Sequence, residues 1–337
     1  MRSPSPPLLR ASRLATALLA ASVAAVSANA SSYDLVDLGR SRTPVAVDDQ
    51  GDIVAQGTKL RVLVRRDDHW HRVAQGEFRA FAINGHGDIS GDDGTLPMLW
   101  QAGKDGVALA LPDNAFSGLG LGINDARMVV GAFAAMDGTI RCFRWTRDGG
   151  SIDIGFMGTG NFCSASDVNN AGQITGGASA SVDNEGPSHA FVFERGRFHD
   201  LGVLPGGNES LGNSINDRGD VAGTATLPPF DEITHAVAWP AGGDIVDLDP
   251  HGMFARSSAT GINESGEVVG TVTLQGTEGR QKAVRFDGQH AVQLESEVRG
   301  LGNWTLDQAV GVNSQGEIVG VGTGPDGLQH GFLLRPR

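Results

Sequence analysis

Short apolar stretches alternate with polar turns along most of the chain, and one phrase of this pattern recurs. In each copy an Asn or Asp follows an apolar strand-like stretch, and two polar residues, usually a Gly, and a new β-branched stretch come next. Asn and Asp side chains accept hydrogen bonds within tight turns, and Gly supplies the left-handed conformation that such a hairpin requires. The seven copies start at Ala46, Ala82, Gly122, Asp167, Ser214, Gly261 and Gly311, with the Asn or Asp at Asp48, Asn84, Asn124, Asn169, Asn216, Asn263 and Asn313. The phrase predicts a hairpin between the first two strands of each repeat.

Arg127 takes the place of the turn glycine in the third copy. A side chain at a left-handed position is unfavourable, so this turn is predicted to be strained or differently built.

Two further strand patterns follow each hairpin. The third strand is represented by HAFVF (189–193) and HAVAW (235–239), and the fourth by FHDLG (198–202) and IVDLD (245–249). Four short strands in each repeat of 36 to 50 residues, joined by short turns, are typical of β-propeller blades.

The two ends of the chain complement each other. The seventh copy ends in HGFLLRPR (330–337), a third strand with no fourth after it, whereas YDLVDLG (33–39) near the start matches the fourth-strand phrases. A solenoid would instead need atypical capping repeats. We therefore predict an all-β, seven-bladed β-propeller over residues 31–337, whose last blade is closed by strand 33–39, with Asp37 beside residues 331–334.

The repeated HAF triplet and the DLG phrase, followed by S-x-A-x-x-[IV]-N-x-x-G-x-[IV]-x-G, resemble the HAF-repeat family of extracellular bacterial proteins. The fourth copy, with Ser164 to Asn169 and His189-Ala190-Phe191, is closest to this pattern. The resemblance covers essentially all of residues 31–337, although the first three copies lack HAF and the second also lacks DLG. It implies secretion and repetition, and it implies no defined activity.

The first 30 residues have the pattern of a secretory signal peptide. Arg2, Arg10 and Arg13 precede an apolar run from Leu14 to Val26, and the segment ends in small residues at Ala30. The run is shorter than the roughly 20 residues that span a bilayer. We predict cleavage after Ala30 and a secreted or periplasmic protein.

The net charge of the chain argues against some classes of binding partner. The full chain carries −13, and removal of the three signal-peptide arginines leaves −16. Such a surface should repel nucleic acid and anionic membranes. We therefore predict no nucleic-acid partner, no stable membrane insertion and a monomer.

Cys142 and Cys163 are the only cysteines of the chain and lie in one repeat. An oxidising compartment permits a disulfide between them, but spacing alone does not show whether their side chains meet. Their spacing is not that of a metal or redox motif.

Recurring His, Asp and aromatic residues invite chemical interpretations, yet each recurs once per blade. His189, His235 and His330 would lie on separate blades and could not share a zinc ion. The end-of-strand aromatics, such as Trp100 and Trp239, are expected in the core, and the recurring acids Asp37, Asp153, Asp200 and Asp247 are expected to stabilise turns. The NDRGD-type hairpins are too short for an EF-hand. No metal site, cofactor or catalytic motif is predicted.

Residues that break the repeat lie just before the first strands, on the face opposite the hairpins. Variable loops on a rigid scaffold are the usual place for function, so this face should hold the ligand site around the channel mouth. The candidates for ligand contact are Arg79, Asn161, Glu209, Phe230, Arg256, Trp304 and Asp307. The leading hypothesis is a binding module for a protein or glycan; a channel-mouth lyase or hydrolase and a structural envelope protein are the alternatives.

Overall fold

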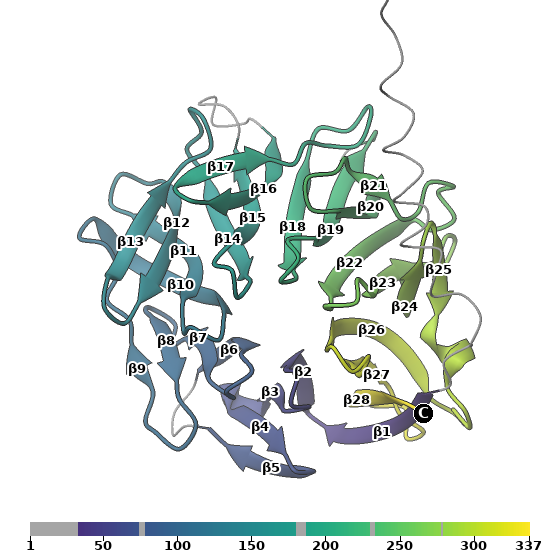
Figure 1. Cartoon of the computed structure of the whole chain (residues 1–337). Helices are drawn as coiled ribbons and strands as arrows, with labels where there is room; N and C mark the ends of the chain where they lie inside the picture. Colours follow the sequence, from purple (N-terminus) through teal and green to yellow (C-terminus); the bar gives the residue numbers. More distant parts are fainter. Residues whose placement is uncertain (1–32, 74–77, 180–186, 230–232, 278) are drawn as a thin grey trace, which may run out of the picture.

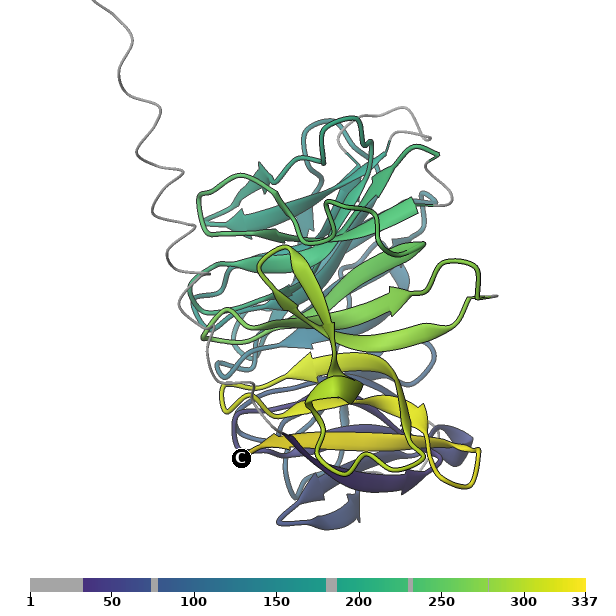
Figure 2. The same cartoon turned by 90° about the vertical axis from the view of Figure 1, so that its right-hand side faces the viewer.

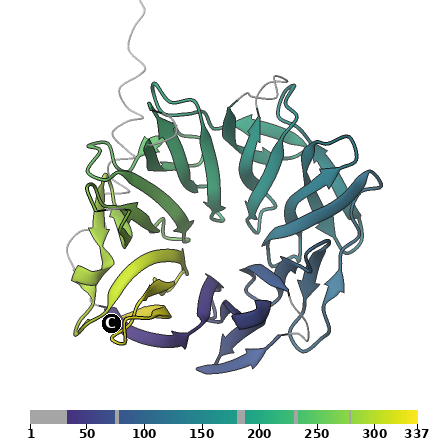
Figure 3. The same cartoon turned by 180° about the vertical axis from the view of Figure 1, so that it is seen from behind.

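The computed structural model describes residues 33–337 apart from 74–77, 180–186, 230–232 and 278, and it arranges their strands in seven four-stranded sheets. Figure 1 shows the sheets placed around a common axis, and Figure 3 shows the same ring from behind. Neighbouring strands are antiparallel, and the first strand of each repeat lies nearest the axis. The fold is therefore an all-β, seven-bladed β-propeller, as the repeats predict.

Each blade takes four strands in order of the chain, except that the last blade takes its outer strand from the N-terminal end. Blades 1 and 2 contain β2 (Arg42–Val47), β3 (Ile53–Gly57), β4 (Val62–Arg66), β5 (His69–Arg72), β6 (Arg79–Ile83), β7 (Ile89–Asp92), β8 (Pro97–Trp100) and β9 (Val107–Ala108). Blades 3 and 4 contain β10 (Ala115–Ile123), β11 (Val129–Ala135), β12 (Ile140–Thr146), β13 (Gly150–Gly155), β14 (Cys163–Val168), β15 (Ile174–Ser179), β16 (Ser188–Glu194) and β17 (Arg197–Asp200). Blades 5 and 6 contain β18 (Ser210–Ile215), β19 (Val221–Leu227), β20 (Ile233–Trp239), β21 (Val246–Asp247), β22 (Arg256–Ile262), β23 (Val268–Thr273), β24 (Gln281–Asp287) and β25 (His290–Gln293). Blade 7 contains β26 (Thr305–Val312), β27 (Ile318–Thr323), β28 (Gln329–Pro336) and β1 (Tyr33–Arg40), and the described residues also form two 3₁₀ turns, η2 (Thr58–Leu60) and η3 (Leu294–Glu297).

Strand β1 closes the ring by pairing with β28. Figure 2 shows the two strands side by side, and in their register Asp37 lies opposite Phe332. The first residue of β1, Tyr33, is 1% exposed and donates its hydroxyl to Glu267 Oε1 of blade 6 at 3.3 Å. The predicted closure is confirmed, and it covers the edge that β28 would otherwise expose to other chains.

The recurring phrase forms the predicted hairpin between the first and second strands. In blade 2, for example, Asn84 Oδ1 accepts hydrogen bonds from the backbone N–H groups of His86 and Asp88. The turn glycine Gly87 has a φ of +72°. Arg127 adopts the same left-handed conformation, with a φ of +60°, and its N–H makes the usual bond to the Asn124 carbonyl. The third hairpin is therefore strained and not differently built.

The core consists of apolar side chains packed between neighbouring blades. The third-strand aromatics Trp100 and Trp239 are each 1% exposed, and Phe286 is 6% exposed. Clusters such as the one that joins Phe191 to Val130 draw on two adjacent blades. These aromatics stabilise the ring, and truncating one should cost about 3–5 kcal/mol.

The alternation of strand direction gives the disc two different faces. The hairpin face carries the turns between first and second strands and between third and fourth strands. The loop face carries the turns between second and third strands and the connections from one blade to the next. No helix among the described residues is long and apolar enough to cross a membrane.

Candidate functional site

The predicted contact residues lie at the starts of the inner strands on the loop face. Arg79 and Arg256 are the first residues of β6 and β22, and Glu209 directly precedes β18. Asn161 lies two residues before β14, and Asp307 lies near the start of β26. They belong to five different blades, so the structure places them around one mouth of the ring instead of gathering them into one cluster.

Arg79 is held by a buried carboxylate. Its Nη2 lies 2.8 Å from Asp92 Oδ1, and the Asp92 side chain is fully buried while that of Arg79 is 45% exposed. The guanidinium also lies 5.8 Å from the centre of the Phe81 ring. Breaking such a pair leaves a buried charge without a partner, so Arg79 has a structural role besides any contact with a ligand.

Asp307 and Glu209 are tied into the scaffold around them. Asp307 accepts hydrogen bonds from the hydroxyls of Thr305 and Thr323 at 2.9 and 3.0 Å. The Glu209 backbone exchanges bonds with Thr226, while the Glu209 side chain is exposed. Both residues lie on rigid backbone at the loop-face mouth.

Asn161 and Arg256 also lie at this mouth. The Asn161 N–H donates to the Ser179 hydroxyl at 3.0 Å, which fixes the entry to β14. Arg256 is exposed at the start of β22, where it pairs in register with Thr273. Phe230 lies outside the described residues.

Trp304 is a core residue, which corrects its prediction as a surface contact. The side chain is 9% exposed and packs in the cluster that contains Leu306 and Phe332. Its ring lies edge-on to His330, with centroids 5.3 Å apart. The sequence showed that Trp304 breaks the repeat, but it did not show that Val298 and the partly buried Leu301, in the preceding segment, join the same cluster.

Exposed large apolar side chains gather on the loop face. Of the nine such side chains in the described part of the chain, only Val107 and Ile152 lie on outer strands away from it. The other seven lie in loop-face turns and connections or at the strand ends beside them: Leu60, Phe116, Met136, Ile140, Leu211, Met253 and Leu328. Large contiguous patches of exposed apolar side chains are typical of interaction sites, so the loop face is the candidate surface.

Four of these seven side chains lie on blades 3 and 5, which flank blade 4, and are named here the apolar rim: Phe116, Met136, Ile140 and Leu211. Ile140 makes a bridge to Phe162 at the start of blade 4. Leu211 of blade 5 lies over Gly177 of blade 4, where an added Cβ would come within 2.9 Å of the leucine methyl group. Residues of the apolar rim thus contact blade 4 from both of its neighbours. Sequence reasoning missed these four residues, although apolar residues beside polar turns, such as Met136 before Asp137-Gly138, were a usable signal.

A disulfide bond joins blades 3 and 4 close to Ile140 of the apolar rim. Cys142 of β12 and Cys163 of β14 are bonded, with Cα atoms 5.0 Å apart, and both side chains are fully buried. The bond joins blade 3 to blade 4 directly beside the bridge between Ile140 and Phe162. The junction between blades 3 and 4 is therefore covalently fixed. The sequence alone did not decide whether these two cysteines are bonded.

The recurring His and Asp residues prove to be partners of one another. His189, His235 and His330 lie 2.9, 3.0 and 2.8 Å from Asp200, Asp247 and Asp37, each pair within one blade. Arg141 and Asp153 make the same link in blade 3, whereas Lys282 of blade 6 pairs with Glu295 of the turn η3, just beyond the fourth strand. The hydrogen bonds that His235 and His330 donate to Asp247 and Asp37 raise the pKa of each histidine above its ordinary value.

The same carboxylates also stabilise a turn, as predicted. Each accepts a hydrogen bond from the backbone N–H two residues later, at 2.7 to 2.9 Å: Asp37, Asp153, Asp200 and Asp247. These groups therefore stabilise the blades. Within the described residues, no cluster of His, Cys, Asp or Glu has an arrangement that could hold a metal ion.

The Asn residues of the hairpins link the blades into an asparagine belt, defined as these six Asn together with Asp48. Each Asn donates its side-chain amide to the backbone carbonyl of the corresponding residue in the next blade, at 2.9 to 3.1 Å: Asn84, Asn124, Asn169, Asn216, Asn263 and Asn313. All six are at most 4% exposed. The belt therefore runs through six of the seven junctions between blades.

Asp48 interrupts the belt at the junction of blades 1 and 2. Its Oδ1 accepts the same turn bonds as an Asn would, but the buried Oδ2 has no partner in the described structure and, when ionised, cannot donate. Burial, with the neighbouring Asp52 charge adding to it, raises the pKa of Asp48 to about 6. The belt is complete only when this carboxyl carries a proton.

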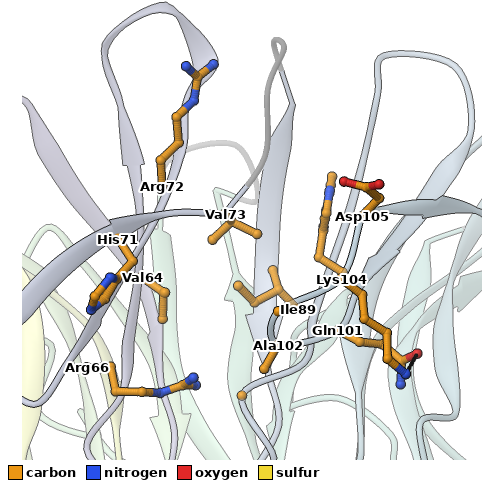
Figure 4. A pocket seen from close by; sticks show the side chains of 13 residues that line it. Val64, Arg66, His71, Arg72, Val73, Ile89, Gln101, Ala102, Lys104 and Asp105 are labelled. Carbon is orange, nitrogen blue, oxygen red and sulfur yellow. Dashed lines mark hydrogen bonds between the residues drawn. The ribbon is translucent and has the colours of Figure 1, made fainter.

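A cavity of about 790 Å³ opens beside the same junction, toward the hairpin face. Figure 4 shows residues of blade 1, such as Arg66 and Arg72, on one side and the 101–105 segment of blade 2 on the other, with Ile89 between them. Trp100 also lines the cavity, and its buried Nε1 has no hydrogen-bond partner in the described structure. One feature of the sequence indicated this region: copies 1 and 2 are among the three copies that lack the HAF triplet.

Comparison with known proteins places the chain among propellers and assigns it no family. No family model and no curated protein matches. A structure described as YCF48 bound to D1 peptide is similar over 92% of this chain and 98% of its own, at 12% identity and a TM-score of 0.51. TolB from Acinetobacter baumannii is similar over 75% of this chain and 62% of its own, at 14% identity and a TM-score of 0.48. An extracellular domain of BT4673 from B. thetaiotaomicron is similar over 90% and 40% of the two chains, at 11% identity and a TM-score of 0.48. The likeness to the YCF48 structure, at this identity, shows the fold alone, which is a β-propeller.

Proposed function

We propose that this propeller is a binding module that captures a protein partner through the apolar rim on its loop face. The observation that carries the proposal is the placement of seven of nine exposed large apolar side chains on this one face. Burying exposed apolar area is the main source of affinity in most protein associations. The interblade disulfide supports it further, because a fixed surface loses less entropy on binding than a mobile one.

The chemistry of the rim favours a protein over a glycan. Met136, Ile140 and Leu211 are aliphatic, and sugars are usually bound by flat aromatic rings together with hydrogen-bonding groups. Phe116 is the single aromatic residue among the exposed large apolar side chains of the described chain. The structure described as YCF48 contains a peptide according to its name, which illustrates that this fold can hold one.

The test compares charge insertion on the rim with charge insertion elsewhere. Phe116 and Val107 are exposed to the same extent, 59% and 58%, but Val107 lies on the outer strand β9. A Phe116→Asp, Met136→Asp variant should lose a partner that the unmodified protein and Val107→Asp both retain in affinity enrichment from the cell envelope. Retention by all three proteins would refute the proposal. A partner released by sugars but not by salt or peptide would instead assign a glycan.

We also propose that the chain is exported, with cleavage after Ala30. The residues concerned lie outside the described structure. The disulfide supports export because such bonds persist in oxidising compartments and are rare in the cytosol. Mass spectrometry of the protein recovered from cell fractions should find a chain that begins at Ser31 in the periplasm or medium; a full-length chain in the cytosol would contradict export.

A further inference from the structure

The outer strand of each blade has one edge that pairs with no other strand of the described structure. Such an edge presents backbone N–H and C=O groups to which another extended chain can add, and proteins usually protect it with a short strand or with charged side chains. Strands β9 and β21 have two residues each, and β5, β17 and β25 have four each. Strand β13 of blade 3 has six residues and lies on the outside of the ring (Figure 1).

The edge of β13 lacks the usual charged protection. Its sequence, GSIDIG, contains one charged residue, Asp153, and that carboxylate already accepts hydrogen bonds from Arg141 and from the Gly155 N–H. Ile152, near the centre of the strand, is 43% exposed. By contrast, the longer β1 carries three charged side chains and is bridged at its first residue. Among the described outer strands, β13 is therefore the one most open to an added strand.

A hollow of about 470 Å³ opens beside β13, between blades 3 and 4. Ile152 and Ile154 line it from blade 3, and Gly172 and Gly196 line it from blade 4. The two isoleucines lie on one face of the strand, because side chains alternate between its two faces. The exposed Ile152 gives the hollow an apolar wall that solvent reaches. Every second side chain of a strand added to β13 would lie over this hollow.

Two arginines give the hollow a positive charge. Arg144 of β12 lies opposite Ile152 in register, and Arg195 lies in the turn between β16 and β17. Neither arginine makes an ion pair within the described part of the chain. Asp153 is the one acid of the lining, and it is already paired with Arg141. In a chain of net charge −13, this uncompensated positive charge favours an acidic segment as the partner.

The backbone at Arg195 adds a separate observation. The residue has a φ of +50°, in the left-handed region that favours Gly or Asn in a hairpin turn. The turn itself therefore does not favour arginine. Its charge beside the hollow is consistent with a role in binding.

We propose that β13 binds an extended acidic segment of a partner protein as a fifth strand of blade 3. The backbone of the segment pairs with the free edge of β13, and an apolar side chain lies against Ile152 over the hollow. Acidic side chains on the same face of the segment reach Arg144 and Arg195. The site lies on an outer strand away from the loop face, so it does not depend on the function proposed for the apolar rim.

The probe for the test is a fluorescein-labelled peptide of the sequence Thr-Glu-Thr-Ile-Thr-Glu-Thr, which places Ile and both Glu on one face when extended. It should bind the full chain saturably in fluorescence polarisation. A peptide with Lys in place of Glu should bind at least about 10-fold more weakly. Methylation of the peptide's backbone nitrogens tests the strand pairing. Because only one edge of the peptide faces β13, methylation of one alternating set of nitrogens should abolish binding and methylation of the other set should not.

Two variants with matched controls test the protein side. Ile152→Asp should weaken binding at least about 10-fold, whereas Val107→Asp, at an exposed residue of the outer strand β9, should not. Arg195→Asn should weaken binding several-fold without lowering thermal stability, because Asn suits the left-handed turn. Its control, Arg299→Asn, removes the same charge at an exposed position after η3 and should leave binding unchanged.

Four results would each overturn the proposal. These are absence of saturable binding at millimolar concentration of the chain, equal binding of the Lys peptide, equal effects of the two methylated sets, and equal losses in the variants and their controls.

Discussion

Blades 4 and 5 and blades 1 and 2 are built on the same four-stranded plan, but they differ in how completely their buried polar groups are paired. In blades 4 and 5 each third-strand His meets a fourth-strand Asp, each hairpin Asn reaches the next blade, and Trp239 bonds to Leu201. In the described chain, all four buried side-chain atoms without a hydrogen-bond partner belong to blades 1 and 2: Asp48 Oδ2, Ser90 Oγ, Asp92 Oδ2 and Trp100 Nε1.

The comparison indicates where stability and where function reside. Regular blades satisfy their polar groups by repeating the same contacts, and each such contact is available because its partner recurs at the corresponding position of the same or the next blade. Buried groups that break the pattern lower stability unless a ligand, proton or partner satisfies them. The cavity lies between blades 1 and 2, the same blades that hold the four unpaired buried atoms.

The largest effect is expected when the defect of blade 1 is copied into blade 5. Asn216→Asp removes the amide that donates to the Asn263 carbonyl and places a second carboxylate against Asp220, which now accepts from Asn216. The free energy of unfolding at pH 8 should fall by about 3 kcal/mol. Urea unfolding followed by tryptophan fluorescence measures this change; a loss below about 0.5 kcal/mol would show that the belt does not stabilise the ring.

The reverse change should repair blade 1. Asp48→Asn supplies the missing donor and should raise the free energy of unfolding at pH 8 by about 2 kcal/mol. The pKa of Asp48 in the folded state, about 6, lies above its ordinary value of 3.8. Stability from the protonated form is therefore fully present below pH 3.8 and is lost as pH rises to 6 and above. The advantage of the variant should shrink toward pH 4, and an advantage independent of pH would contradict this account.

The smallest expected effect is a dependence of folding stability on pH that comes from the His235–Asp247 pair of blade 5. The hydrogen bond that His235 donates to Asp247 raises the pKa of His235. Pairing with the protonated ring therefore stabilises the fold fully below pH 6.5, and this stabilisation is lost as pH rises through the raised value. Between pH 6 and pH 8 the unmodified protein should lose about 1 kcal/mol more stability than His235→Gln. Asp247→Asn should remove the same dependence. Parallel pH profiles for all three proteins would show that this pair does not respond to pH.

Several features were predictable because they depend on local chemistry. The hairpin phrase places Asn and Gly where any tight turn needs them, and the match of residues 33–39 to a fourth strand was enough to predict that Asp37 lies beside residues 331–334, where it pairs with Phe332. The burial of Trp100 and Trp239 followed from their recurrence. The positions of Arg79, Glu209 and Arg256 at the starts of inner strands followed from the order of the strands.

Other features were not predictable, because they depend on which blades pack together and how closely. The sequence treated His235 and Asp247 as separate candidates, although they are partners across a strand pair. Trp304 broke the repeat and was expected at the surface, but its ring lies in the core beside His330. The apolar rim combines residues of blades 3 and 5, which are not consecutive along the chain.

The sequence by itself thus determined the number of blades, the closure by strand β1 and the asparagine turns, since these depend on spacing and on turn geometry within a few residues. Tertiary structure alone decided that Cys142 meets Cys163, that Asp48 and Trp100 are buried without partners, and that exposed apolar residues gather on the loop face. The physical reason is that pairing and burial are properties of the junctions between blades, where residues distant in the sequence meet.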